Sequence, residues 1–325
     1  MRGRLLGRSP RLAIALVVVA LAVATAAVAG LQPADLSFTP NSEGQMTNID
    51  VARAYAKNYY GDATATTGSS ATGGWTHQLN LGSNYSAEAR SVAKQGEDWL
   101  AARANVPNRA IVLDVDDTTL TTWNYELFSN WDFNPTTNGN FVGLTSGAFT
   151  GNMFPATPGM LELANKAHDL GYAIFWITGR GDSQHQATVA NLQNDIAAGF
   201  ANITSVNYSG ATVPEIDAGY PAPTAINTGH PLLAPFTDGL FTKPATGTAT
   251  TPNQYPAYLN KPEFCAAAIA ANASCATIPY KSGTRAYIES QGYDIVADFG
   301  DQFSDLLGGY ADKTFKMPNP NYYLP

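Results

Sequence analysis

The chain has 325 residues, of which 45% are hydrophobic and 14% are charged, and its formal net charge is −8 at neutral pH. The hydrophobic fraction excludes a disordered chain and is enough for one large α/β domain with an insertion, or for two small domains. The acidic balance excludes binding to nucleic acid or to anionic lipid through a basic surface.

The first thirty residues predict a secretion signal, so that residues 31–325 would form the mature protein. A basic start is followed by an apolar run over residues 12–29 that ends in A-x-A patterns for cleavage. An uncleaved membrane anchor is the alternative, because a run of this length is just enough to span a bilayer. A leader over residues 1–30 holds four Arg and no acidic residue, so its removal takes the formal charge from −8 to −12. We therefore expect a secreted or extracytoplasmic protein that binds neither nucleic acid nor, after cleavage, a membrane.

Helix and strand patterns alternate through the rest of the chain. Apolar residues at helical spacing predict helices over residues 48–59 and 87–104, with a loop rich in Gly, Thr and Ser over residues 61–83 between them. Residues 110–113 are all apolar and β-branched in the middle, which predicts a buried parallel strand. Residues 121–156 then carry many aromatic side chains, which predict a cap inserted over the strand ends or, as the alternative, ordinary core packing.

The second half of the chain continues this alternation. Thr157 as N-cap and Pro158 in the first turn predict a helix that ends near Gly171. Further elements are predicted at residues 172–177 (strand), 183–198 (helix), 239–242 (strand-like run), after Lys281 (helix) and at 294–299 (strand). Residues 205–262 predict an irregular insertion rich in Pro and Thr. The alternation predicts a three-layer α/β/α, Rossmann-like fold, in which helices cover both faces of a parallel sheet and a small cap is inserted.

The two cysteines of the chain, Cys265 and Cys275, favour a disulfide because export places them in an oxidising compartment. Two buried free thiols are the alternative. Ten residues of straight helix would separate them by about 15 Å, so the chain must turn between them, and residues 272–274 are the expected place.

The first predicted strand ends in a pair of carboxylates, Asp114 and Asp116, which alternation puts on the same side of the chain. Two carboxylates this close repel each other and need a cation or a shared proton. The pair suits Mg²⁺, and it offers one group to attack and one to transfer a proton. A calcium loop is excluded because Thr119 and Tyr125 stand where such a loop needs Gly and Glu. The remaining alternative is an Asp-rich turn.

Two other strand ends carry polar groups. Thr178, Gly179 and Arg180 offer a hydroxyl, an approachable backbone N–H and a bidentate cation for a phosphate, although the same residues also suit a simple turn. Asp301 and Asp305 are one helical turn apart, so both can reach one metal ion. The alternative for this pair is an N-capping Asp beside a solvated one.

An attack on phosphate by a carboxylate needs cationic cover beyond one metal ion. Lys281 is the candidate, with Lys243 at another strand end as its rival, and a solvated surface charge is the alternative for each. Other phosphate-cleaving motifs are absent from the sequence: there is no Arg-His-Gly, no Cys-x5-Arg and no His-Glu-x-x-His.

The order of these motifs resembles the haloacid dehalogenase superfamily: Asp-x-Asp-x-Thr, then Thr-Gly-Arg, then Tyr-Lys-Ser, then Gly-Asp-Gln-x-Ser-Asp-Leu. More narrowly, it is similar to the exported acid phosphatases of that superfamily, the group that includes plant vegetative storage proteins and class B-type acid phosphatases. The resemblance covers residues 85–205 and 277–323. Residues 206–276 depart from the family pattern. The resemblance therefore predicts neither the substrate preference nor the pairing of the two cysteines.

The resemblance implies a role for each matched residue. Asp114 is the nucleophile and a metal ligand, and Asp116 is the general acid and base that also binds Mg²⁺ through its backbone carbonyl. Thr178 and Lys281 hold the phosphoryl oxygens. Asp301 is a metal ligand, and Asp305 is a ligand through water or a partner of the ligands.

We therefore expect a Mg²⁺-dependent enzyme that hydrolyses small phosphomonoesters through an aspartyl phosphate. A non-catalytic storage or binding protein on the same fold is the alternative from another class, and the presence of Asp114 favours the enzyme. Dehalogenase chemistry is disfavoured, because dehalogenases of this fold lack the proton-transferring residue that Asp116 supplies. Transfer of the phosphoryl group to an alcohol is the second alternative.

Overall fold

The computed structural model describes residues 48–64, 77–142, 154–193, 219–226, 238–248 and 254–323. The chain divides into two compact units, residues 1–55 and 56–325. Of the first unit, the structure describes the beginning of helix α2 (Ile49–Tyr60), where the Asn48 side chain accepts a hydrogen bond from the N–H of Asp50 at 3.0 Å. The predicted leader lies outside the described residues.

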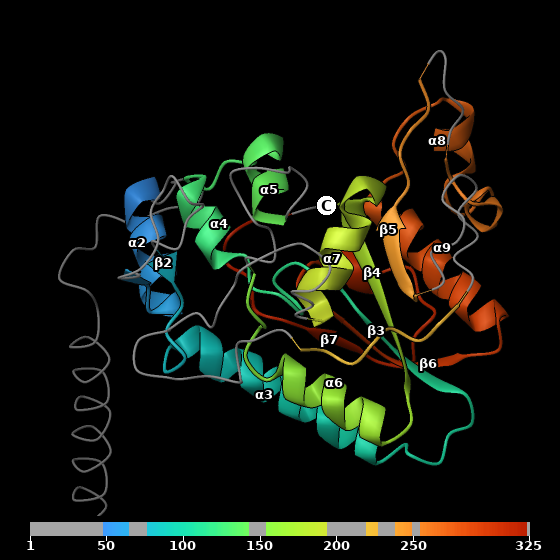
Figure 1. The fold of residues 1–325 in the computed structure, drawn as a ribbon, viewed down its shortest axis with the longest axis horizontal. Helices are drawn as coiled ribbons and strands as arrows, with labels where there is room; N and C mark the ends of the chain where they lie inside the picture. The colour runs from blue at the N-terminus through green and yellow to red at the C-terminus, as the bar shows by residue number, and fades with distance from the viewer. Residues whose placement is uncertain are drawn as a thin grey trace, which may run out of the picture. The chain divides into compact units, whose positions relative to one another are not determined.

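The second unit contains a five-stranded sheet in the order β5-β4-β3-β6-β7, and all neighbouring strands are parallel (Figure 1). The strands are β3 (Arg109–Leu113), β4 (Ala173–Gly181), β5 (Leu240–Lys243), β6 (Asp294–Gly300) and β7 (Thr314–Lys316). The chain adds β4 and β5 on one side of β3 and then returns to add β6 and β7 on the other. The boundary between β3 and β6 is therefore the switch point of the sheet, at whose carboxyl edge such folds place their sites.

Helices cover both faces of this sheet, which confirms the predicted three-layer fold. Helices α3 (Asn84–Ala101) and α6 (Met160–Asp169) lie side by side along one face, whereas α9 (Thr277–Ser290) lies on the other (Figure 1). The side chains of β3 alternate between the two layers, as a buried strand requires. Ile111 and Leu113 belong to the core under α3 and α6, whereas Ala110 and Val112 belong to the core under α9.

The beginnings of α6 and α9 change which residues these helices contain. Helix α6 begins at Met160, and Gly159 is its N-cap, with a φ of 87°. This left-handed conformation is one that Gly adopts without strain. The prediction of Thr157 as the N-cap is therefore wrong. Helix α9 begins at Thr277 and so contains Lys281, which was predicted to precede it. Pro279 is tolerated there because the first turn of a helix needs no N–H from it.

The other predicted elements are present with shifted ends. Helix α3 begins three residues earlier than predicted, with Ser83 as its N-cap, and β4 extends to Gly181. After β4 come the 3-10 helix η2 (Asp182–Gln184) and α7 (His185–Gln193); the end of the helix predicted over residues 183–198 lies outside the described residues. The predicted loop at residues 61–83 contains two short antiparallel strands, β1 (Ala63–Thr64) and β2 (His77–Gln78).

The part of the predicted cap that the structure describes holds helices α4 (Trp123–Phe128) and α5 (Pro135–Val142). Two of its rings are core: Trp123 is 1% exposed and Tyr125 is 3% exposed. Trp123 stacks on Tyr60 with a centroid separation of 4.1 Å. These two rings therefore pack α4 against the rest of the unit, as the alternative of ordinary core packing predicts for them. The cap over residues 121–156 stays a prediction.

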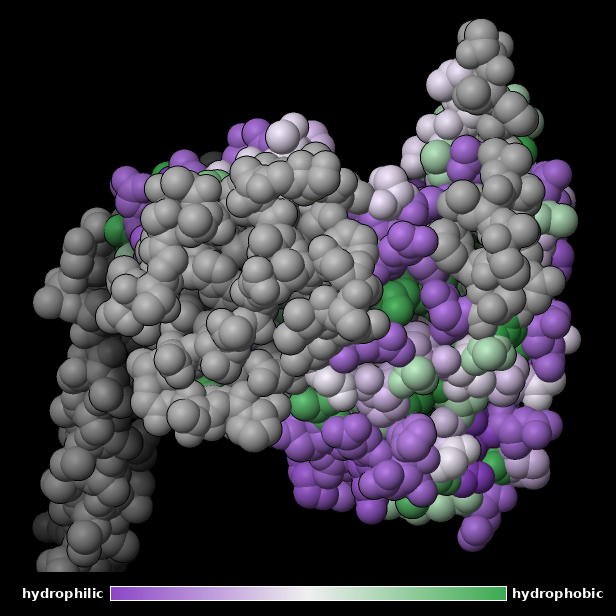
Figure 2. Space-filling view, in the orientation of Figure 1, coloured by the Kyte–Doolittle hydropathy of each residue, from purple (hydrophilic) through white to green (hydrophobic). Residues whose placement is uncertain are grey.

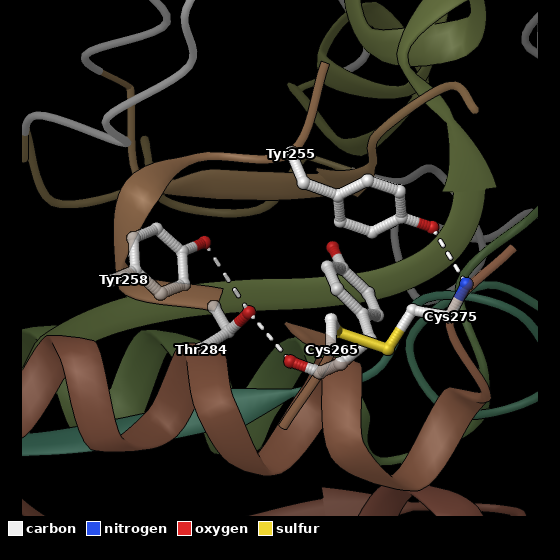
Figure 3. Close-up of a disulfide and its surroundings, with 6 residues drawn as sticks. Tyr255, Tyr258, Cys265, Cys275 and Thr284 are labelled. Atoms are coloured by element: carbon white, nitrogen blue, oxygen red, sulfur yellow. Dashed lines mark hydrogen bonds between the residues drawn. A yellow bond between two sulfur atoms is a disulfide. The ribbon is translucent and has the colours of Figure 1, made fainter. Parts of the chain in front are cut away.

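A disulfide joins Cys265 to Cys275, as predicted, with a Cα–Cα distance of 5.4 Å (Figure 3). Between the two residues lie the short helix α8 (Ala266–Ala270) and a turn at Asn272, which has a φ of 52°. The hydroxyl of Tyr255 accepts a hydrogen bond from the N–H of Cys275 at 2.9 Å (Figure 3). The disulfide therefore closes a small loop immediately before α9.

The coloured part of Figure 2 shows hydrophilic and hydrophobic residues interspersed over this face of the molecule. Among the described residues, no helix is both long enough and apolar enough to cross a membrane.

Candidate active site

The loop after β3 is built to hold its carboxylates in fixed directions. The N–H of Asp114 donates to the carbonyl of Phe299 in β6 at 2.9 Å, so Asp114 continues the sheet register, and the hydroxyl of Thr119 donates to the Asp114 carbonyl. Asp117 then turns the chain with a φ of 53°. The carboxylate of Asp117 accepts hydrogen bonds from the N–H and the hydroxyl of Thr122 at 2.9 and 2.6 Å, which closes the turn.

Strand β6 brings two more carboxylates to Asp114. Asp301 directly follows this strand, and Asp305 lies in the short helix α10 (Phe303–Leu306). Gly300 permits this close approach, because a Cβ at this position would lie 2.3 Å from the Cβ of Asp305. Oxygen atoms of Asp114, Asp301 and Asp305 all lie within 4.8 Å of one another, and all three residues are buried. The sheet therefore gathers these three predicted residues into one cluster of oxygen ligands.

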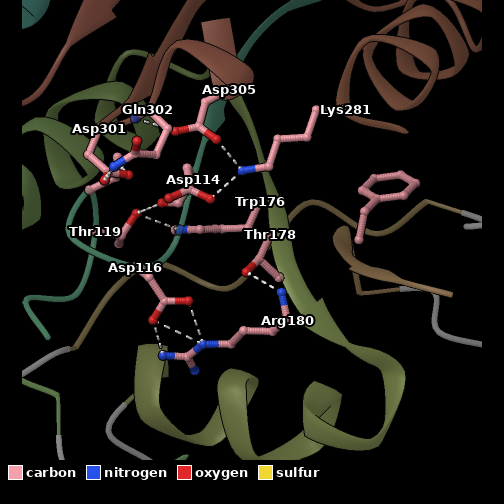
Figure 4. A network of polar contacts seen from close by, with 12 residues as sticks. Asp114, Asp116, Thr119, Trp176, Thr178, Arg180, Lys281, Asp301, Gln302 and Asp305 are labelled. Carbon is pink, nitrogen blue, oxygen red and sulfur yellow. Dashed lines mark hydrogen bonds and ion pairs between the residues drawn. The ribbon is translucent and has the colours of Figure 1, made fainter. Parts of the chain in front are cut away.

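Lys281 enters this cluster from α9. Its Nζ atom lies 2.5 Å from Oδ1 of Asp114 and 2.7 Å from Oδ1 of Asp305 (Figure 4). Burial lowers the pKa of Lys281, but the carboxylates of Asp114 and Asp305 outweigh it and raise that pKa above its usual value, so the amino group is charged. Of the two lysines that the sequence offered, Lys281 therefore contacts Asp114. The rival Lys243 lies at the end of β5, where burial and the charge of Lys281 lower its pKa.

Strand β4 supplies the remaining predicted residues. Thr178 is buried, and its hydroxyl accepts a hydrogen bond from the N–H of Arg180 at 3.1 Å. Gly179 is exposed, and no atom lies within 4 Å of the position that a Cβ would take, so a ligand can approach its backbone closely. The guanidinium of Arg180 points to Asp116, with Nη2 2.7 Å from Oδ1 and Nε 3.0 Å from Oδ2 (Figure 4). Each carboxylate of the Asp-x-Asp pair thus has its own cation.

The electrostatics of the cluster favour a bound cation. Burial raises the pKa of Asp114 well above its usual value, and the charge of Lys281 only partly opposes this effect. Burial, followed by the neighbouring charges of Asp305 and Asp117, raises the pKa of Asp301 to about 7. A set of buried carboxylate oxygens without sulfur or imidazole fits a hard divalent ion, which would offset their repulsion.

Arg285 supports this edge of the sheet, a role that was not predicted from the sequence. It lies one turn after Lys281 on α9, is 1% exposed and pairs with Asp298 at 3.0 Å. Its guanidinium also donates to the carbonyls of Asp305 and Leu307, and to that of Gly309 at 2.8 Å. Arg285 therefore fastens the segment that carries Asp305 to α9.

Two further carboxyl groups near the site were also missed. Burial raises the pKa of Asp117 to about 6, and its position next to Asp116 in the motif was the signal available for it. Glu126 in α4 is 9% exposed, and burial, followed by the charges of Asp117 and Asp116, raises its pKa to about 8. No sequence pattern pointed to Glu126, because only the packing of α4 brings it near the aspartates.

Comparison with known proteins identifies one family. The family model described as HAD superfamily, subfamily IIIB (acid phosphatase), matches residues 64–210 and 263–325, which together make up more than half of the chain.

Individual relatives match shorter segments. "Stem 28 kDa glycoprotein" of Glycine max is 51% identical over 49 residues, which are 14% of this chain and 19% of that protein. "Vegetative storage protein 2" of Arabidopsis thaliana is 44% identical over 48 residues, 15% of this chain and 18% of that protein. "Acid phosphatase 1" of Solanum lycopersicum is 28% identical over 171 residues, 52% of this chain and 43% of that protein. The chain thus spans less than half the length of each of these relatives.

Among solved structures, the class C acid phosphatase from Bacillus anthracis aligns with a TM-score of 0.43 and 17% sequence identity. The alignment covers 74% of this chain and 80% of that one.

Proposed function

The chain belongs to the haloacid dehalogenase superfamily, subfamily IIIB, the acid phosphatases, and from this premise we propose that it hydrolyses phosphomonoesters through an aspartyl phosphate on Asp114. The observation that carries the proposal is the position of the Asp114 carboxylate. It stands at the carboxyl edge of the sheet, in contact with Lys281 and within one cluster with Asp301 and Asp305. Asp116 follows it two residues later with a separate cation, Arg180.

The proposed reaction has two steps. In the first, a carboxylate oxygen of Asp114 attacks phosphorus, the bond from phosphorus to the ester oxygen breaks, and that oxygen takes a proton from Asp116 and leaves as the alcohol. In the second, Asp116 takes a proton from water as the water oxygen attacks phosphorus. The bond from phosphorus to Asp114 breaks, inorganic phosphate leaves, and Asp114 and Asp116 return to their starting protonation states.

We propose Mg²⁺ as the ion that the carboxylates hold. Asp114, Asp301 and the backbone carbonyl of Asp116 would be its ligands, with Asp305 as a ligand through water. When bound, the ion offsets the negative charge of the carboxylates and the phosphoryl oxygens. The buried set of oxygen donors and the raised pKa values of Asp114 and Asp301 support this assignment.

The phosphoryl oxygens need donors of their own. We propose the hydroxyl of Thr178, the backbone N–H of Gly179 and the ammonium of Lys281. Thr178 and Gly179 lie near the carboxyl end of β4, where Gly179 leaves room for a ligand, and Lys281 contacts Asp114. The substrate class that this arrangement supports is a small phosphomonoester. The predicted leader and the disulfide between Cys265 and Cys275 support an extracytoplasmic location.

A storage role is the second candidate, because one of the relatives named above is a vegetative storage protein of Arabidopsis thaliana. The experiment that separates the candidates is a screen of phosphomonoesters on the purified protein with Mg²⁺, with a chelator, and with the Asp114→Asn variant. The proposal predicts turnover that the chelator abolishes and Mg²⁺ restores, and a loss on the order of 10⁴ or more in the variant. If the folded wild-type protein turned over no ester, the result would favour the storage role. Product esters formed with an added alcohol would instead identify phosphoryl transfer.

A further inference from the structure

The guanidinium of Arg180 is committed to the carboxylate of Asp116. Nη2 donates to Oδ1 at 2.7 Å, and Nε donates to Oδ2 at 3.0 Å and to Oδ1 at 3.2 Å (Figure 4). Two nitrogens facing two oxygens form a planar fork, which fixes the plane of the carboxylate as well as its distance. From the sequence, the same guanidinium was expected to contact phosphate.

Arg180 is itself held in place by its surroundings. Its Nη1 donates to the hydroxyl of Thr188 at 3.0 Å, and this hydroxyl donates to the carbonyl of Gln184 at 2.8 Å. The ring of Phe154 lies 5.3 Å from the guanidinium carbon, within the range of a cation–π contact. The Arg180 side chain is 4% exposed, whereas that of Asp116 is 29% exposed. A buried, anchored cation therefore restrains a carboxylate that reaches toward solvent.

We propose that Arg180 is a positioning residue for Asp116: it fixes the carboxyl group for proton transfer to and from the ester oxygen and does not bind the phosphoryl group. This inference rests on the proposed function. Without the fork, Asp116 would rotate about its side-chain bonds, and a proton donor must lie within hydrogen-bond reach of its acceptor.

The restraint leaves the proton transfer possible. A carboxylate offers about four lone-pair sites, and the three contacts from Arg180 leave at least one free for the transferred proton. The phosphoryl group has other donors nearby, because Lys281 contacts Asp114 directly and Gly179 leaves open space at the end of β4. Phosphate binding therefore does not require the guanidinium of Arg180.

The test uses the dependence of the rate on the leaving group. A p-nitrophenyl ester leaves as a stabilised anion and needs little protonation, whereas an alkyl ester such as glycerol phosphate needs a proton from Asp116. General acid catalysis is typically worth on the order of 10² to 10⁴ in rate. Arg180→Lys keeps the charge but loses the fork, so we expect kcat on the alkyl ester to fall by about 10² or more. We expect kcat on the p-nitrophenyl ester to fall by less than about tenfold, with little change in KM for either ester.

Two further variants complete the experiment. Thr188→Val removes the anchor of Arg180 without touching the carboxylates, so the same pattern should appear with a smaller loss, and this variant carries the test should Arg180→Lys fail to fold. Asp116→Asn removes the group being positioned. The double variant Arg180→Lys with Asp116→Asn should therefore be no slower than Asp116→Asn alone.

Equal losses on both esters, accompanied by a raised KM and weaker inhibition by inorganic phosphate, would show that Arg180 binds the phosphoryl group and would overturn the inference. Additive losses in the double variant would overturn it as well. A folded wild-type protein without turnover would overturn the proposed function together with the inference, and that result is distinct from a change in the leaving-group pattern.

Discussion

Glu126→Gln should make the protein more stable in base and leave its stability in acid nearly unchanged. Glu126 is 9% exposed, and burial, followed by the charges of Asp117 and Asp116, raises its pKa from 4.5 to about 8. The folded state therefore holds a proton that the unfolded state has lost between these values. For a raised pKa, the contribution to stability is fully present below the unfolded pKa and is lost as the pH rises through the folded one. Gln mimics the protonated side chain at every pH, so the variant should not show this loss.

The size of the effect follows from the interval between the two pKa values. From 4.5 to about 8, at about 1.4 kcal/mol for each pH unit, the upper bound is about 5 kcal/mol. Relaxation and water entry reduce it, so we expect the variant to be more stable than the wild type by at least about 1 kcal/mol at pH 9. In a domain of this size, each kcal/mol moves the melting temperature by about 2 to 4 °C.

The assay is chelator-treated thermal and urea unfolding of both proteins at pH 5 and pH 9. Glu263→Gln is the matched control, because Glu263 is exposed and the same substitution there should change stability little at either pH. A stability difference between Glu126→Gln and the wild type that is the same at both pH values would refute the reasoning, since it would mean that Glu126 is solvated in the folded protein.

Replacing Cys265 and Cys275 together by Ser should lower the free energy of unfolding by about 3 kcal/mol, because it frees a loop of 10 residues in the unfolded chain; an unchanged urea midpoint would contradict this. Lys281→Met should abolish turnover and cost about 3 to 5 kcal/mol at pH 8, because two buried carboxylates lose their cation. The cost should be less at pH 5, because burial raises the pKa of Asp114 and a lower pH favours its neutral form. Equal losses at both pH values in urea unfolding would count against that electrostatic account. Trp123→Leu should lower the melting temperature and slow aryl and alkyl esters alike, since this ring is core; a selective rise in KM for aryl esters would instead place it at the substrate.

The fold was predictable because its strands are buried on both faces and are therefore continuous apolar runs, as residues 110–113 are. Helix ends were less predictable, because a conformation such as the φ of 87° at Gly159 is a property of the local turn. The positions of the strand-end carboxylates were predictable as well, because they follow from the geometry of an extended strand and of a parallel sheet. Their side follows from alternation in an extended chain, and the carboxyl edge of a parallel sheet brings Asp114 and Asp301 together.

The partners of the charged side chains were not predictable in the same way. Arg180 has the right chemistry for phosphate, but its direction is set by the positions of Thr188 on α7 and of the Phe154 ring, which sequence spacing does not encode. Glu126 lies in the segment that was predicted as a cap, and only the packing of α4 shows that it is buried. Pairing and burial of this kind depend on contacts between elements far apart in the chain, so only the structure reports them.

The most direct test of the central claim is to trap the phosphorylated enzyme. Wild-type protein turning over a phosphomonoester with Mg²⁺ is quenched in acid, digested and analysed by mass spectrometry, with Asp114→Asn as the control. The account predicts one phosphoryl group on Asp114 that hydroxylamine removes and that the variant lacks. Turnover in Asp114→Asn within about tenfold of the wild type, or a phosphoryl group on another residue, would contradict it.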